Sequence, residues 1–401
     1  MPMPPVFHLI AALLGCVLVA ATLPLLLELL VLSLAAALPA PAVGQQRAKK
    51  LRVAVIIPAH NEEKLIRNCV QSVGRVAGLF VVAHNCTDET AERASQAGAT
   101  VLAWNDSVGG KGTALDYGFR HAVQDGADVL LVLDADSIAG PGLIEAVASA
   151  FSAGAQAVQC RYEVANPEAN RRTRLTALAF RGMNVLRPRG RHRLGLSCGI
   201  FGNGFAVSAS TLKRVPYTPN SLVEDLEYHL HLIRAGIRVE FLNHASVFGE
   251  MPETSAAATS QRVRWEGGRI LMRRLWSKSL ALEVLRGNFR MLEPLLDLRA
   301  LPLATESALL ILALICGLVA QVYPLAVYAA VGMATSILYI LVAASLGPDT
   351  LATLSALAAA PALLAWKMLL ISRTRLAAKS NAAWIRTERN AARDKPDEPS
   401  A

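Results

Sequence analysis

The stretch LLVLDADS, Leu130 to Ser137, joins a short apolar run to two carboxylates, and a Pro-Gly break follows at Pro141 and Gly142. The apolar run has the length of one buried strand, and the break predicts a turn. Asp134 and Asp136 would then lie at the carboxyl end of that strand, where open α/β sheets bind ligands and where two acids suit a divalent cation and a phosphate. Because Asp residues at turns also form local backbone hydrogen bonds, a purely structural role is the alternative.

Strand-like and helix-like runs alternate on both sides of this stretch, between Arg52 and Leu242. Repeated strand–helix units predict an α/β fold with a mostly parallel sheet and helices on both faces, an architecture typical of nucleotide binding. The expected strands are 53–57, 79–83, 101–103, 129–133, 155–162, 205–208 and 238–242. The expected helices are 62–73, 88–97, 113–124, 143–151, 171–185 and one that ends at Ala235 and is capped by Asn220 or Ser221.

The composition indicates a membrane protein. Of the 401 residues, 53% are hydrophobic and 18% are charged, a balance too apolar for an ordinary soluble protein. The apolar excess lies in two blocks, 5–43 and 301–371, whose windows of about 20 apolar residues match a bilayer span. We interpret the first block as a retained anchor, since it is too long for a signal peptide and no Lys or Arg precedes it.

Basic residues predict how the chain is oriented in the membrane, and the apolar blocks predict the order of its segments. Arg47, Lys49, Lys50 and Arg52 follow the first block, so the positive-inside rule places the next domain in the cytoplasm of a multi-pass inner (cytoplasmic) membrane protein. The expected segments are a transmembrane anchor at 1–45, a cytoplasmic α/β domain at 46–275, an amphipathic interface helix at 276–300, transmembrane helices at 301–372 and a basic tail at 373–401.

The number of C-terminal spans is left open by the sequence. Three candidates, about 302–321, 324–346 and 351–371, would put the tail outside, whereas the Arg and Lys residues of the tail favour the inside. Either one span is re-entrant or divided differently, or the tail departs from the rule.

The net charge of +9 and the six scattered cysteines limit the partners and the compartment. Arginines cluster at 171–193 and 262–274, and contact with anionic lipid head groups or sugar diphosphates explains them more simply than nucleic acid. DNA or RNA binding through 171–193 would predict steeply salt-dependent affinity, and we expect no nucleic-acid partner. The absence of a Cys-x-x-Cys pair favours a reduced compartment and argues against a zinc site or a disulfide framework.

Two motifs near predicted helix starts have phosphate-binding and structural interpretations. PAHNEE, 58–63, would offer helix N–H groups, and Glu62 would accept hydrogen bonds from a ribose or base; acids there also complement the helix dipole. GGKGT, 109–113, is not a P-loop, because the required glycine spacing fails. Lys111 would contact a phosphate or stand as a solvated loop lysine.

Two later motifs carry groups suited to catalysis and sugar binding. Glu224 and Asp225 lie in the first turn of a helix, where a carboxylate stays ionised as a general base or serves only in capping. Gln261, Arg264 and Trp265 share one helix face at i, i+3 and i+4. A guanidinium matches a diphosphate and an indole stacks on a sugar ring, although both side chains also suit a membrane interface.

The order of these motifs along one chain resembles that of the membrane-bound family-2 glycosyltransferases, the group of cellulose synthases, poly-N-acetylglucosamine synthases and ceramide glucosyltransferases. The resemblance covers about residues 52–275. It implies a Rossmann-like nucleotide-sugar transferase domain of the GT-A type with flanking transmembrane helices. The matching motifs are PAHNEE at 58–63, NCTD at 85–88, KGTAL at 111–115, DAD at 134–136, ED at 224–225 and QxxRW at 261–265.

The resemblance also implies roles for single residues. Asp134 and Asp136 would bind Mg²⁺ or Mn²⁺, with Asp136 the more direct ligand. Asp225 would deprotonate the acceptor hydroxyl for an in-line, inverting attack. The residues implied to bind the nucleotide sugar are Pro58, Ala59, Glu62, His84, Lys111 and Asp134. Those implied to bind the diphosphate and the acceptor are Glu224, Gln261, Arg264 and Trp265.

His84 departs from the family pattern, which commonly has an acid that contacts the base at this position. The expected donor is a UDP-linked sugar. Because His84 stands where that acid would be, the sequence leaves the choice of nucleotide base open. The expected activity is transfer of a hexose or N-acetylhexosamine to a lipid or polysaccharide acceptor, in exopolysaccharide or glycolipid synthesis. A polymerase with so few spans would need a partner subunit or a homo-oligomer. The alternative function, which only His84 favours, is a catalytically silent nucleotide-sugar-binding scaffold of an envelope polysaccharide complex.

Overall fold

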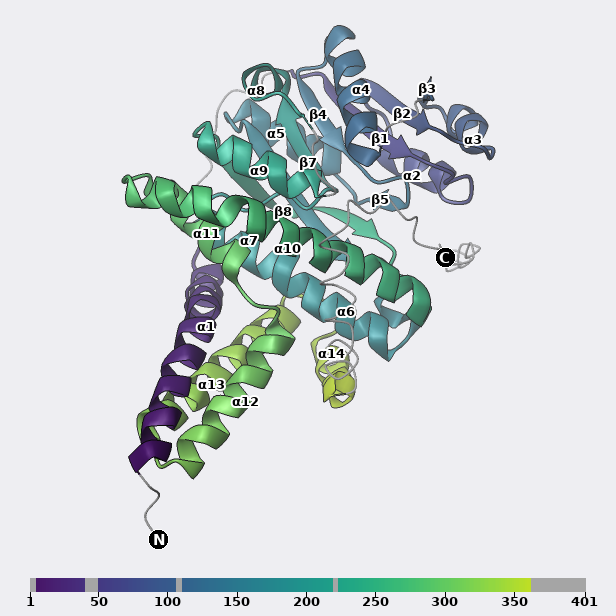
Figure 1. The fold of residues 1–401 in the computed structure, drawn as a ribbon. Coiled ribbons are helices and arrows are strands. Elements are labelled where there is room, and N and C mark those ends of the chain that lie inside the picture. The colour runs from purple at the N-terminus through teal and green to yellow at the C-terminus, as the bar shows by residue number, and fades with distance from the viewer. Residues whose placement is uncertain (1–4, 40–49, 106–109, 219–222, 362–401) are drawn as a thin grey trace.

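The computed structural model describes residues 5–39, 50–105, 110–218 and 223–361. An α/β domain occupies the upper part of Figure 1, and a bundle of long apolar helices extends from its lower side. The helices α6 and α10, defined below, cross the boundary between these two parts (Figure 1).

One mixed sheet of eight strands forms the centre of the α/β domain, in the order β3-β2-β1-β4-β7-β6-β8-β5. The bounds are β1 Val53–Ala59, β2 Gly78–His84, β3 Thr100–Trp104, β4 Val129–Val132, β5 Ser137–Ala139, β6 Ala157–Val164, β7 Phe205–Ser208 and β8 Val239–Gly249. The strands β3, β2, β1 and β4 are parallel, as predicted. The rest of the sheet is mixed: β7 runs antiparallel to β4 and β6, β5 runs antiparallel to β8, and β6 and β8 are parallel.

The central strands β1 and β4 are apolar because both of their faces are covered. Ile56 of β1 pairs with Val132 of β4, and both side chains are fully buried. The helices α2, α3 and α5 contribute to the core on one face of the sheet, and α4 and α9 contribute to the core on the other. Since β1 and β4 are parallel and adjacent, the residues that follow their carboxyl ends lie at the same edge of the sheet.

Most of the expected helices begin and end within two residues of the predicted positions, but the helix expected at 62–73 begins only at Ile66, and the one at 209–214 was not predicted. Their bounds are α2 Ile66–Val73, α3 Thr90–Gln96, α4 Lys111–Gln124, α5 Leu143–Ser152, α6 Arg171–Arg181, α7 Arg187–Arg193, α8 Ala209–Arg214 and α9 Glu224–Arg234. The helix expected at 171–185 continues further, because a π-helical turn at Gly182–Leu186 joins α6 to α7. The predicted cap of α9, Asn220 or Ser221, falls outside the described residues.

Three long helices form the apolar bundle: α1 Pro5–Ala37, α12 Leu303–Val319 and α13 Tyr323–Ser345. The helices α1, over His8–Ala37, and α13 are long and apolar enough to cross a membrane, and α12 makes a third candidate only together with the bent segment before it. Beside the end of α13, Arg161 of β6 donates to the carbonyl of Leu346 at 2.7 Å. The end of α13 therefore lies next to the α/β domain.

The third predicted span, 351–371, is described only to residue 361. That part forms α14, Thr350–Ser355, and a short 3₁₀ turn, Ala356–Ala359. The remainder of the span and the basic tail at 373–401 lie outside the described residues.

The segment 276–300, expected to be one amphipathic helix, is divided. The long helix α10, Ser255–Leu285, includes its first part, and α11, Leu292–Arg299, forms its last part after a turn at Gly287. Its buried apolar residues pack on α9 and α10 in a cluster of Leu230, Ile233, Met272, Leu280, Met291, Leu295 and Leu298.

Buried ion pairs join α1 to the α/β domain. Glu28 of α1 contacts Arg187 and Arg191 of α7, the second at 2.6 Å. Asp297 of α11 contacts the same two arginines at 2.6 and 2.7 Å. All four side chains are at most 14% exposed, so these arginines are part of the interior and do not form a basic surface. We call Glu28, Arg187, Arg191 and Asp297 the anchor cluster.

Candidate active site

The site is built around Asp134, at the carboxyl end of β4. The ammonium of Lys111, the first residue of α4, lies 2.5 Å from Oδ1 of Asp134. The same ammonium donates a hydrogen bond to the carbonyl of Gly202 at 2.6 Å. Lys111 is thus not a solvated loop lysine, because its charged group lies between the DAD motif and a third segment of the chain.

That third segment is the loop before β7, for which the sequence predicts no role. The side-chain oxygen of Asn203 accepts a hydrogen bond from the backbone N–H of Asp134 at 3.1 Å, and its amide donates to the Ser137 hydroxyl at 2.7 Å. Gln159 of β6 also fixes this loop, because its side-chain amide donates a hydrogen bond to the carbonyl of Asn203 at 2.8 Å. The Gly-Asn-Gly run at 202–204 is the signal in the sequence that could have revealed this loop.

Asp225 approaches the same point from α9. A Cβ atom on Gly202 would lie 3.1 Å from Oδ2 of Asp225 and 3.4 Å from the ammonium of Lys111. Gly202 also has a φ of +72°, which glycine adopts without strain. The other oxygen of Asp225 accepts from the N–H of Leu226 at 2.8 Å. Lys111 and Asp225, which are distant in sequence, therefore both border the space that a side chain at Gly202 would fill.

Burial and neighbouring charges shift the titration of these groups. Burial, reinforced by Asp225, raises the pKa of Glu224 to about 7. Burial also raises the pKa of Asp225, while the N–H of Leu226 and the charge of Lys111 oppose that rise. For Lys111, burial disfavours the charged form, but Asp134, Glu224 and Asp225 outweigh it and raise its pKa. The site therefore holds a permanent cation next to a pair of carboxyl groups that resist ionisation.

The motifs that follow β1 and β2 support each other. Asn61 and Asn85 both have left-handed backbones, with φ of 55° and 50°. The side chain of Asn61 accepts from the N–H of Thr87 at 2.7 Å. The N–H of Glu62, whose side chain is buried, donates to the Thr90 hydroxyl at 2.7 Å. Thr87 of the NCTD motif and Thr90, two residues after it, therefore fix the PAHNEE loop. Pro58 and Ala59 of this loop end β1.

His84 belongs to a stack of rings at the ends of β2 and β3. Its ring lies 4.9 Å from that of Trp104, and the Trp104 ring lies 5.1 Å from that of Tyr117 in α4. The Nε2 atom of His84 is 3.3 Å from the amide nitrogen of Asn85. Only 5% of His84 is exposed, so most of the imidazole contacts protein.

Asp134 and Asp136 have the chemistry of a divalent-cation site completed by a substrate. Mg²⁺ sites in proteins commonly use one or two carboxylates together with substrate phosphates and water. Within the described ranges, the only group of three or more closely spaced ligating side chains is Glu28, Glu293 and Asp297. Arg187 and Arg191 already neutralise that group, so the DAD motif fits a metal better.

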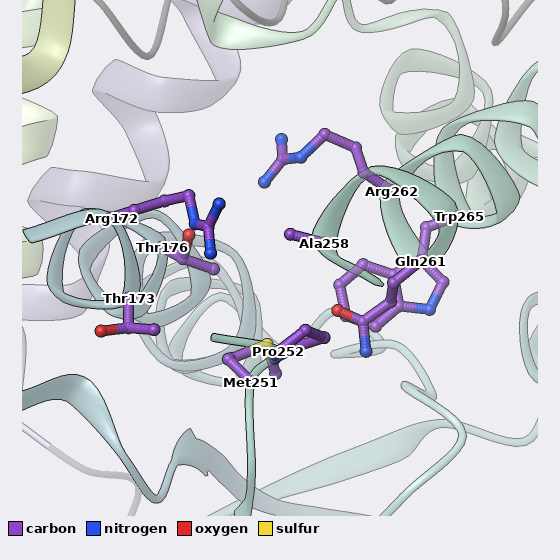
Figure 2. Close-up of a pocket in the computed structure, with 9 residues that line it drawn as sticks. All are labelled: Arg172, Thr173, Thr176, Met251, Pro252, Ala258, Gln261, Arg262 and Trp265. Carbon is purple, nitrogen blue, oxygen red and sulfur yellow. The ribbon is translucent and has the colours of Figure 1, made fainter. Parts of the chain in front are cut away.

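The QxxRW motif lies on α10, and part of it lines a pocket between α6 and α10 (Figure 2). Gln261 and Trp265 contribute to it, and Arg262, not Arg264, is the arginine on the lining face. The other lining residues come from α6 and from the segment after β8: Arg172, Thr173, Thr176, Met251, Pro252 and, on α10, Ala258. One turn beyond Trp265, Gly268 packs closely against Val223, which directly precedes Glu224 and Asp225.

Comparisons with known proteins identify the family of this domain. Residues 51–268 match the family model described as "Glycosyltransferase like family 2". The chain is 26% identical over 235 residues to "Probable glycosyltransferase YdaM" of Bacillus subtilis (strain 168), and 36% identical over 87 residues to "Protein RfbJ" of Shigella flexneri. These matches cover 54% and 21% of this chain. The chain spans only 55% and 64% of the length of these two relatives.

A solved structure shares the fold. The mannosyltransferase PcManGT of Pyrobaculum calidifontis, solved with GDP-Man and Mn²⁺, superposes with a TM-score of 0.51 and 19% identity. The match covers 84% of this chain and 98% of that one. The prediction of a GT-A type domain flanked by apolar helices is thereby confirmed.

Proposed function

Because the chain belongs to the family-2-like glycosyltransferases, we propose that it is an inverting hexosyltransferase. It moves a hexose or N-acetylhexosamine from a nucleotide sugar, UDP-linked, to a membrane-associated acceptor. The observation that carries this proposal is the meeting of Lys111, Asp134 and Asp225 around Gly202. A cation, a metal-binding carboxylate and a base within one small space are the groups that sugar transfer from a diphosphate requires.

Asp225 acts as the general base in this proposal. Its carboxylate takes the proton of the acceptor hydroxyl while the acceptor oxygen forms a bond to the anomeric carbon. On the opposite face of the sugar, the bond from the anomeric carbon to the diphosphate oxygen breaks, which inverts the configuration. The raised pKa of Asp225 suits this role, because a more basic carboxylate accepts a proton more readily.

Lys111 stabilises the departing diphosphate. Its ammonium is fixed at 2.5 Å from Asp134 and 2.6 Å from the Gly202 carbonyl, so no reorganisation is needed as negative charge develops on the leaving group. Asp134 and Asp136 would hold Mg²⁺ or Mn²⁺, which when bound neutralises charge on the diphosphate. Pro58, Ala59, Glu62 and His84 line the nucleotide side of the site.

The acceptor reaches Asp225 from the side of α10. Glu224, Gln261, Arg264 and Trp265 are the residues proposed to hold the diphosphate and the acceptor. The close packing of Gly268 on Val223 supports this, because it fixes α10 against the first turn of α9. Trp265, which is 38% exposed, offers an indole face for a sugar ring.

The membrane part of the proposal is a multi-pass protein of the inner membrane with the domain at 46–275 in the cytoplasm. Two apolar helices of sufficient length, α1 and α13, support it. A pair of C-terminal spans, α12 and α13, would return the chain to the cytoplasmic side, which agrees with the basic tail. The product would be an exopolysaccharide or a glycolipid, and a polymerase would need a partner subunit or a second copy.

The test uses the full chain in detergent or nanodiscs with Mn²⁺ and a panel of UDP-sugars. UDP release with one sugar, its loss on chelation and its return on adding Mn²⁺ are the expected results. Mass spectrometry of the product then separates a single transfer from a polymer. No UDP release with any sugar and acceptor extract, despite tight UDP binding, would favour a silent scaffold and contradict the proposal.

A further inference from the structure

A buried tyrosine near the site has a hydroxyl group without a partner in the described part of the chain. Tyr217 follows β7 and α8 and belongs to none of the motifs that the sequence presents. Only 3% of the residue is exposed, and its hydroxyl oxygen forms no hydrogen bond with any described residue. Native proteins retain very few buried polar groups of this kind, because an unpaired one destabilises the fold. The hydroxyl of Tyr217 therefore calls for a partner that arrives from outside the chain.

Two aromatic rings fix the position of Tyr217. The ring of Phe119, in α4, contacts it edge-on with the ring centres 5.3 Å apart, and the ring of Tyr228, in α9, lies 4.9 Å away. All three residues belong to the buried cluster on one face of the sheet. The helix α4 begins at the site with Lys111, and α9 carries Asp225 in its first turn. Tyr217 thus packs between the two helices that supply the proposed cation and the proposed base.

The hydroxyl of Tyr217 lies near the carboxyl groups of the site. Burial raises the pKa of Tyr217 well above its usual value, and the negative charges of Glu224, Asp225 and, more weakly, Asp134 raise it further. No hydrogen bond joins the hydroxyl to any of these three side chains. The oxygen is therefore close enough to experience their charges but too far from them to bond directly. A group that both accepts and donates hydrogen bonds could connect the phenol to a carboxylate.

The chemistry of the proposed transfer identifies that group. In an in-line attack the transferred sugar lies between the base, Asp225, and the leaving diphosphate, whose place Lys111 and Asp134 mark. A sugar hydroxyl can accept from the phenol while it donates to a carboxylate. A phosphate oxygen only accepts, and neighbouring carboxylates repel it. The group that fits beside Tyr217 is therefore a hydroxyl of the donor sugar.

We infer that the hydroxyl of Tyr217 binds a hydroxyl of the donor sugar and selects the sugars that carry it. This inference rests on the proposed function, since it adds a specificity-determining residue to the same site. A polar group that is built to bind a substrate hydroxyl discriminates against an analogue without it, because the polar group is then left buried and unpaired. Tyr217→Phe removes this hydroxyl and keeps the ring contacts with Phe119 and Tyr228.

The test measures donor binding without an acceptor, by calorimetry on the full chain in nanodiscs with Mn²⁺. The probes are UDP, UDP-glucose, UDP-N-acetylglucosamine and the forms of both UDP-sugars that lack one sugar hydroxyl. Tyr217→Phe is expected to weaken the tighter-binding UDP-sugar about threefold to tenfold, the effect of one hydrogen bond between neutral groups, and to leave UDP binding unchanged. One of the deoxy forms should bind the variant and the unmodified chain equally, because the hydroxyl that Tyr217 contacts is already missing from it.

Tyr228→Phe is the matched control. The hydroxyl of Tyr228 donates to the carbonyl of Val215 at 3.1 Å and is therefore already paired. This variant should leave the binding of every probe unchanged but lower the melting midpoint of the chain without ligand. Tyr217→Phe removes an unpaired hydroxyl, so the melting midpoint of that variant should stay the same or rise. The melting measurement needs no donor and therefore does not depend on transfer.

Three results would overturn the inference. The first is equal affinity of Tyr217→Phe and the unmodified chain for both UDP-sugars. The second is a loss of affinity that is the same for every deoxy form. The third is a melting midpoint that falls as far as in Tyr228→Phe, because the hydroxyl would then have a partner within the folded chain or a buried water. Selective binding through Tyr217 without transfer of any sugar would reject the proposed function and support this inference.

Discussion

The ammonium of Lys111 lies 2.5 Å from the carboxylate of Asp134, although the two residues belong to motifs that the sequence presents separately. The contact exists because α4 begins where β4 ends, at the shared edge of the parallel strands. It gives Asp134 a fixed cation as its neighbour. The pair therefore marks where the diphosphate of the proposed donor would lie.

Lys111→Met is expected to reduce kcat/KM for the sugar donor by about 10- to 100-fold, because a charge-assisted hydrogen bond contributes about 1.5–3 kcal/mol. Methionine has a similar length but carries no charge. Initial rates of UDP release measure the effect, with Lys213→Met on α8 as the control for a lysine outside the site. A kcat/KM within threefold of the unmodified chain would remove Lys111 from the diphosphate site.

The sequence alone predicts the parallel half of the sheet and the order of the motifs along the chain. Asp134, Lys111 and Asp225 each follow a strand or open a helix, and strand ends of a parallel sheet meet at one edge. The sequence could not place the loop at Gly202 and Asn203, because its contacts depend on β7 running antiparallel to β4. No local pattern encodes that reversal.

Contacts between side chains that are far apart in the chain also could not be predicted from the sequence. The arginines at 171–193 are predicted to contact anionic lipid head groups or sugar diphosphates, yet two of them, Arg187 and Arg191, are buried against Glu28 and Asp297, each more than 100 residues away. Likewise, helical spacing showed that Gln261 and Trp265 share a face, but the rotation of α10 against α6 decides that Arg262 and not Arg264 joins them.

The pH profile of kcat should have an acidic limb at a higher pH than an ordinary aspartate would give. Burial raises the pKa of Asp225 and that of Glu224, the latter to about 7. A general base works only when deprotonated, so activity falls as pH drops through the raised pKa. Glu224→Gln removes the neighbouring acid and should move the limb to lower pH, whatever it does to the maximal rate. A profile that is flat from about pH 5 to 8, or a limb that stays in place in the variant, contradicts this assignment.

Glu28→Ala should destabilise the whole chain. It leaves Arg187 and Arg191 without one of their buried acidic partners, and breaking a buried pair costs about 3–5 kcal/mol. We expect the melting midpoint in detergent to fall by at least about 5 °C. Asp125→Ala is the control, since its pair with Arg52 is more than half exposed and contributes at most about 1 kcal/mol. Equal melting midpoints for the two variants would show that the anchor cluster does not stabilise the contact between α1 and the α/β domain.

His84→Ala should raise the KM for the nucleotide sugar with little change in kcat. The variant removes one ring from the stack with Trp104, and an aromatic pair contributes about 0.5–1.5 kcal/mol, or roughly three- to tenfold in affinity. Steady-state kinetics with UDP-linked and GDP-linked forms of one sugar give the comparison. If kcat falls and KM stays constant, His84 does not act in nucleotide binding.

The most direct test of the central claim is the rate of UDP release by Asp225→Asn with the preferred donor and acceptor, measured beside Asp116→Asn. Asp116 is a carboxylate on the outer side of α4, paired with Arg120, so its variant should retain the full rate. The account predicts that Asp225→Asn loses about 10²- to 10⁴-fold in kcat, the contribution of a general base, while it still binds UDP. A rate for Asp225→Asn equal to that of Asp116→Asn would contradict the account.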